Sequence, residues 1–205
     1  FFFLVPAGAF VIVEMIHGDE SLHFSIDRIL RNYFLYLFLE SACAALSLSV
    51  KTASLITMGS TAIYGFINYY VMRFRGVPLS FSDFFSWQTA LNVSTNYDYT
   101  LTLPALKALL LFAIFIILIC KLLLPSAFGL TQKCLFKKLL IRCGTFGITI
   151  FGIAFILLNT NFLSVTLSQW DYENDLQENG VLFSFAVQTR SSYITKPTAY
   201  SEENL

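Results

Sequence analysis

The residues that could do chemistry are a few charged side chains set among long apolar runs. Glu14 lies near the end of the first apolar run, and Glu40 lies inside the second. An ionised carboxyl group within a membrane costs at least about 3 kcal/mol unless it is paired or hydrated, so an intramembrane acid is a functional candidate by default. The alternative for each is a structural ion pair or hydrogen bond that holds helices together, with Arg28, Arg31 or a later arginine as partner.

Two further cations follow the third apolar run, in Val71-Met-Arg73-Phe-Arg75. Guanidinium groups bind phosphate through charge-assisted and often bidentate hydrogen bonds. Arg73 and Arg75 are therefore candidates for binding a lipid phosphate. The alternative is that both arginines are ordinary anchors at the membrane interface.

No complete catalytic apparatus is visible. The sequence has no GxSxG or HExxH motif and no glycine-rich phosphate loop. The segment His17–His23, with its two acids, matches no metal-ligand spacing, and the four cysteines have neither CxxC nor metal-ligand spacing. We therefore assign no catalytic residue, metal ligand or cofactor to this chain. A net charge of zero gives no reason to expect a nucleic-acid partner.

The elements that must position these residues are membrane helices. Hydrophobic residues make up 56% of the chain and charged residues 13%, whereas soluble domains carry roughly 25% charged residues. A helix needs about 20 mainly apolar residues to cross a bilayer. Five stretches approach that length, so we predict an all-α polytopic membrane protein with five transmembrane helices, at about residues 1–16, 33–50, 53–72, 103–124 and 139–163.

Two details of this bundle follow from single residues. Only Lys51 and Thr52 separate the second and third runs, which predicts a tight antiparallel hairpin. The fifth run carries Gly144, Gly147 and Gly152, and small residues let backbones approach closely in lipid. The alternative is that glycine is simply common in membrane helices.

Charge predicts the orientation. The segment between the fourth and fifth runs is basic and has no acid, which is typical of a cytoplasmic loop; its cations are Lys121, Lys133, Lys137, Lys138 and, just beyond, Arg142. The N-terminus is then cytoplasmic and the C-terminus extracellular, with residues 17–32, 73–102 and 164–205 outside. Arg28, Arg31, Arg73 and Arg75 lie in those outer segments and weaken the asymmetry.

The outer segments have structure of their own. Ser80 and Asp83 have capping-box spacing, and aromatic residues follow at helical spacing. We expect a short interfacial helix there, the alternative being a capped helix packed on the bundle. Residues 164–205 are predicted to form an extracellular linker, broken at Asn179-Gly180. Because the chain begins at Phe1 inside an apolar run, it is predicted to be a piece of a longer protein that continues past Leu205.

A series of short motifs, taken in their order along the chain, resembles the sequences of lipoteichoic acid synthase-like proteins. They are Val13-Glu14, Asn68-Tyr-Tyr, Arg73-Phe-Arg75-Gly-Val-Pro78, Asp83-Phe-Phe, Ala90-Leu-Asn-Val93, Asn96-Tyr97, Trp170, Asn179-Gly180-Val-Leu-Phe183 and Lys196-Pro197-Thr-Ala-Tyr200-Ser201. The resemblance covers about residues 5–205, although each motif alone is short and degenerate.

This resemblance implies the membrane domain of a phosphoglycerol transferase of Gram-positive envelopes, used in cell wall biogenesis. Such proteins join five membrane helices to an extracellular domain of the alkaline phosphatase and sulfatase superfamily. That domain uses a threonine nucleophile and manganese or magnesium to transfer glycerol phosphate from phosphatidylglycerol. None of those catalytic residues maps onto this chain, which would instead anchor its own extracellular catalytic domain and present the lipid.

The implied lipid-headgroup residues are Asn68, Arg73, Arg75 and Asp83, with Glu14 and Glu40 behind them. Two other functions stay open at this point. One is the membrane domain of a phosphoethanolamine transferase, which shares the five-helix plan. The other is a small transporter or channel that uses Glu40, against which no internal repeat is visible.

Overall fold

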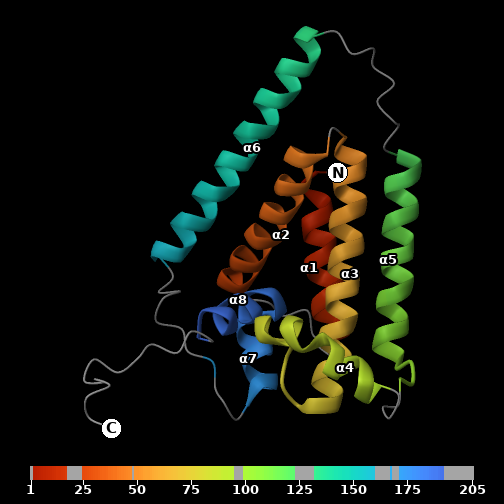
Figure 1. Cartoon of the computed structure of the whole chain (residues 1–205). Coiled ribbons are helices and arrows are strands. Elements are labelled where there is room, and N and C mark those ends of the chain that lie inside the picture. Colours follow the sequence, from red (N-terminus) through yellow and green to blue (C-terminus); the bar gives the residue numbers. More distant parts are fainter. Residues whose placement is uncertain are drawn as a thin grey trace.

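The computed structural model describes residues 2–17, 25–47, 49–94, 99–122, 132–159, 167 and 171–191, and over these residues it is helical with no strand (Figure 1). In chain order the elements are α1 (Leu4–Ile16), α2 (Ile26–Leu46), α3 (Val50–Arg75), the 3₁₀ helix η1 (Phe81–Ser86), α4 (Trp87–Ser94), α5 (Leu103–Leu122), α6 (Gln132–Asn159), α7 (Tyr172–Asn179) and α8 (Val181–Ser191).

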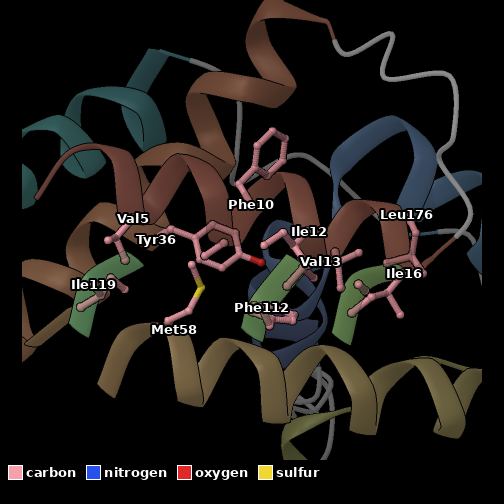
Figure 2. Packing of buried hydrophobic residues seen from close by; sticks show 13 residues of the cluster. Val5, Phe10, Ile12, Val13, Ile16, Tyr36, Met58, Phe112, Ile119 and Leu176 are labelled. Atoms are coloured by element: carbon pink, nitrogen blue, oxygen red, sulfur yellow. The ribbon is translucent and has the colours of Figure 1, made fainter. Parts of the chain in front are cut away.

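Helix α1 lies at the centre of the bundle. It packs against α2, α3 and α5, while α6 packs along α2 on the outside (Figure 1). Its apolar side chains meet those of the surrounding helices in one buried cluster, in which Val5, Tyr36, Met58 and Ile119 lie together (Figure 2). Leu176 of α7 belongs to the same cluster, so the C-terminal segment is continuous with the core.

Within the described residues each of the five predicted runs contains a helix, but only α2 and α5 are long and apolar enough there to cross a membrane. Helix α1 has 13 residues, and the apolar part of α6 is the stretch Cys143–Ala154. Helix α3 has ample length, but it buries a row of polar side chains, which lowers its apolar content: Ser54, Thr57, Thr61 and Asn68. By length and composition, two of the described helices, α2 and α5, are therefore candidate membrane spans.

Several helix boundaries differ from the predicted ones. Helix α2 begins at Ile26 rather than near residue 33, because the Ser25 hydroxyl caps it by accepting from the Arg28 amide at 3.3 Å. Glu40 is therefore fourteen residues from the start of its helix, much deeper than predicted. Lys51 and Thr52 lie within the first turn of α3, so they belong to that helix and do not connect it to α2, which ends at Leu46.

Close contact with a neighbouring helix is predicted at three glycines of α6, and the structure has it at one of them. A methyl group placed on Gly152 would lie 2.6 Å from a ring carbon of Phe34, whereas at Gly144 and Gly147 it would meet nothing within 4 Å. Of these three glycines, Gly152 is therefore the one that packs against α2.

The two ends of the bundle differ in chemistry. At one end, Lys51 donates to the Cys120 carbonyl at 2.9 Å, which places Lys51 beside the C-terminal end of α5. Helix α6 begins at Gln132, so the part of the predicted basic loop that follows Gln132 is helical. Residues 123–131 lie outside the described residues. At the other end, η1, α4, α7 and α8 gather below α1, α2 and α3 (Figure 1); we call this the capped end.

Candidate functional site

The first turn of α8 is capped by side chains from two other helices. A helix begins with backbone N–H groups that have no partner within the helix. Glu14 of α1 accepts from the Val181 amide at 2.9 Å, and Asn32 of α2 accepts from the Phe183 amide at 3.0 Å. The C-terminal segment is thus held to the bundle through its own helix N-terminus.

Glu14 is neutralised as well as hydrogen-bonded. Its second carboxylate oxygen lies 2.7 Å from Nη2 of Arg28, and both side chains are buried. Such a pair is tolerated in a low-dielectric interior only with good geometry and further hydrogen bonds. The negative charge also lies at the positive end of the α8 dipole. Glu14 therefore joins α1, α2 and α8 at one point.

Asn32 is the second junction between the bundle and the C-terminal segment. Its amide nitrogen donates to the Asn179 carbonyl at 2.7 Å and to the Arg28 carbonyl at 3.0 Å. Gly180, between α7 and α8, has φ +87°, and an added Cβ would overlap the Asn32 side chain. The predicted break at Asn179-Gly180 is thus a turn that only glycine fits.

His17 and Asn68 tie α1 to α3. His17 Nδ1 donates to the Val13 carbonyl at 2.9 Å, which leaves Nε2 to accept from the Asn68 amide at 2.8 Å. Asn68 also accepts from the Leu79 amide at 2.7 Å. Desolvation by burial lowers the pKa of His17 to about 4, although the bond to Val13 acts in the opposite direction. Asn68 is fully buried, so its side chain is committed to internal contacts.

The two candidate arginines have different surroundings. Arg75 is paired with Asp83 at 2.8 Å. Partial burial of Asp83 raises its pKa, but hydrogen bonds from Arg75 and Ser80 outweigh burial, and the net shift is downward. Arg73 donates to the Thr100 carbonyl and hydroxyl, each at 3.1 Å. Those acceptors are neutral, so they leave the charge of Arg73 in place.

A pocket of about 220 Å³ opens at the capped end, next to Arg73. Its lining residues are Glu14, His17, Arg28, Tyr69, Met72, Arg73, Glu173, Leu176 and Gln177. It therefore brings together the ends of α1 and α3, the start of α2, and α7. The structure places Arg73 and Glu14 at this pocket, while Arg75, Asp83 and Asn68 do not line it.

The predicted capping box is confirmed at η1, where Asp83 accepts from the Ser80 amide at 2.8 Å. The segment it begins is a 3₁₀ helix that continues into α4, in place of one α-helix. Its aromatic side chains are between 45% and 78% exposed, at Phe81, Phe84, Phe85 and Trp87. They thus form an apolar surface on the capped end and are not packed into the core.

Glu40 lies apart from this network. One carboxylate oxygen accepts from the Ser54 hydroxyl at 2.6 Å, and the other is buried without a hydrogen-bond partner, as is the Thr57 hydroxyl. One residue further on, Ser41 bonds Thr149 of α6 at 2.9 Å. Glu40 therefore contributes to α2–α3 packing through the hydrogen bond that it accepts from the Ser54 hydroxyl.

Sequence reasoning missed the roles of Arg28, Asn32 and the α7 residues. In the sequence, Arg28 is one of several possible partners for Glu14. Asn32 belongs to no motif that would predict a contact with another helix. The remaining predicted features, Asp19 to His23, Asn96-Tyr97, Trp170 and residues 196–201, lie outside the described residues. Within the described residues no group of three or more His, Cys, Asp or Glu side chains is placed to hold a metal ion.

Comparison with known proteins gave no match: no family model, curated protein or solved structure is significantly similar to this chain. The function therefore has to be argued from the geometry of the capped end.

Proposed function

We propose that this chain is the membrane domain of a bacterial phosphoglycerol transferase, which anchors the enzyme and presents phosphatidylglycerol to an extracellular catalytic domain. The observation that carries the proposal is the attachment of α7 and α8 to the bundle through Glu14 and Asn32. A domain that must hold a following enzyme against lipid headgroups needs such a rigid junction, since misplacement by about 1 Å can cost two orders of magnitude in rate.

The membrane topology belongs to the same proposal. We propose that α1, α3 and α6 join the two apolar helices α2 and α5 as spans of one five-helix domain, with the N-terminus in the cytoplasm. Lys51 at the opposite end from α7 and α8 supports this orientation. The exposed aromatic side chains of η1 and α4 support a position of the capped end at the headgroup level, where aromatic residues concentrate.

In this proposal the transfer reaction itself is carried out by a separate catalytic domain. The resemblance implies a sulfatase-like domain after Leu205 with a threonine nucleophile and Mn or Mg. The test is to reconstitute the native gene product in vesicles that contain phosphatidylglycerol and phosphatidylethanolamine, and to follow the loss of each phospholipid together with diacylglycerol release. Consumption of phosphatidylglycerol supports the proposal. Consumption of phosphatidylethanolamine instead would make this the membrane domain of a phosphoethanolamine transferase.

One observation favours a second candidate, a small transporter. Glu40 and Thr57 bury oxygen atoms without hydrogen-bond partners inside the bundle, and buried intramembrane acids occur in ion pathways. Reconstituted protein would then show solute flux that disappears in Glu40→Gln. Flux that is absent, or equal in the variant, would exclude this role for Glu40.

A further inference from the structure

The pocket at the capped end has a composition that can be matched to a ligand. We propose that it binds the headgroup of phosphatidylglycerol, with the phosphate at Arg73 and the glycerol hydroxyls at Glu173 and Gln177. This inference rests on the proposed function and adds the site and the residues that would select the lipid.

The charges around the pocket single out Arg73 as the phosphate ligand. Arg28 is already held by Glu14 at 2.7 Å, and His17 is neutral at ordinary pH because its pKa is about 4. Arg73 is exposed and donates to neutral acceptors on Thr100. A guanidinium has more N–H donors than these two bonds use, so Arg73 can bind a phosphate oxygen without breaking either.

The opposite wall offers acceptors for hydroxyl groups. Glu173 and Gln177 lie four residues apart on α7, hence on one helix face, and both are exposed. With Arg28 and Arg73 positive and Glu14 and Glu173 negative, the formal charges of the lining residues sum to zero. A pocket of that kind suits a phosphodiester with a single negative charge and an uncharged polar alcohol better than a multiply charged phosphate.

Size and location agree with a lipid headgroup. The cavity of about 220 Å³ is smaller than the ~300–1,000 Å³ of sites that enclose drug-sized ligands. It has apolar wall segments at Met72 and Leu176, which can contact the carbon atoms of the headgroup. It also lies at the end of the bundle that carries the exposed aromatic residues of η1, where headgroups would be within reach.

The chain offers a matched control for the test. Arg73 and Arg75 are two residues apart at the end of α3 and both are exposed, but only Arg73 lines the pocket. The chain is reconstituted in phosphatidylcholine nanodiscs with equal amounts of phosphatidylglycerol and phosphatidylethanolamine, and the lipid retained after extraction is counted by native mass spectrometry. Phosphatidylglycerol retention should fall roughly tenfold in Arg73→Gln, the loss expected for a charge-assisted hydrogen bond, and should be unchanged in Arg75→Gln.

A third variant separates the two headgroup chemistries. Glu173→Gln keeps a hydrogen-bond acceptor for hydroxyls but removes the charge that would attract an ammonium group, so phosphatidylglycerol retention should persist. Preferred retention of phosphatidylethanolamine that Glu173→Gln abolishes would overturn the assignment. Competition by soluble glycerophosphoglycerol, the phosphodiester headgroup without its acyl chains, supports recognition of the headgroup itself. Failure to compete, with Arg73-dependent retention intact, shows that the bilayer-held lipid is the ligand.

The outcomes also separate this inference from the proposed function. Equal retention in wild type, Arg73→Gln and Arg75→Gln, with unchanged thermal unfolding, would overturn the pocket assignment even if the native gene product releases diacylglycerol from phosphatidylglycerol. Arg73-dependent retention in a protein whose native product consumes no phosphatidylglycerol would sink the enzyme proposal and leave the lipid site standing.

Discussion

The capped end and the middle of the bundle each contain a fully buried glutamate, and the two are held in different ways. Glu14 is bonded to a guanidinium and to a backbone amide, and so connects α1, α2 and α8. Glu40 is bonded to one hydroxyl group of the neighbouring helix, and its other oxygen has no partner. Burial alone therefore does not show what an acidic side chain inside the bundle does, whereas its hydrogen-bonding partners do.

The comparison predicts its largest effect at Glu14. Glu14→Gln keeps the shape of the side chain but breaks the buried ion pair with Arg28. Removing one partner of a buried pair destabilises by about 3–5 kcal/mol. We expect unfolding at lower temperature and faster hydrogen exchange at Val181 and Phe183.

A paired replacement serves as its control. Glu14→Gln combined with Arg28→Met removes both charges and keeps a side-chain oxygen for the Val181 amide, so we expect most of the lost stability to return. Wild-type exchange of the α8 amides in Glu14→Gln would contradict the junction.

The second largest effect is expected from acid, which should lower the folding stability of the capped end. The pKa of His17 is lowered from 6.5 to about 4, so between these values the unfolded chain binds a proton that the folded chain does not. Stability then rises with pH through this window and is lost as pH falls from 6.5 towards 4, by up to about 3 kcal/mol. Protonation would place an N–H of the ring against the Asn68 amide.

Thermal unfolding measured across this range checks the effect. His17→Gln removes the titrating group and should flatten the profile between pH 6.5 and 4. A slope that persists in this variant would assign the pH dependence to another group.

Gly180 offers a smaller perturbation of the same junction. At φ +87° an L-residue is strained by roughly 1–3 kcal/mol, and a Cβ would also displace Asn32. Gly180→Ala should loosen α8 in hydrogen exchange.

Gly144→Ala is the matched control, because nothing lies within 4 Å of its added methyl group. There alanine should be neutral or stabilise the helix by up to about 1 kcal/mol. Equal losses in the two variants would show that the turn at Gly180 is not special.

The smallest effect is expected at Glu40. Glu40→Gln keeps an oxygen for the Ser54 hydroxyl and separates no ion pair among the described residues, so the change in unfolding free energy should stay below about 1 kcal/mol. Measured in the same membrane mimetic as Glu14→Gln, a comparable loss at both positions would break the comparison between the two glutamates.

The sequence by itself determined the helical class, the approximate positions of the five apolar runs and the capping box at Ser80 and Asp83. These features depend on local composition and on spacing within a few residues, which physical chemistry ties directly to helix formation. It placed the start of α2 wrongly, because Asp27, Arg28 and Arg31 look like loop residues until their partners are known. Among the described helices only α2 and α5 are long and apolar enough to span a membrane, so the five-span topology stays a prediction.

Only the tertiary structure decided which charged residues meet. The Glu14–Arg28 pair, the contact of Asn32 with Phe183 and the pocket beside Arg73 join segments up to 167 residues apart in the chain. No spacing rule reaches over that distance, because these contacts depend on how α7 and α8 fold back onto the bundle. Two arginines that are equivalent in sequence were thereby separated, Arg75 into an ion pair with Asp83 and Arg73 into the wall of the pocket.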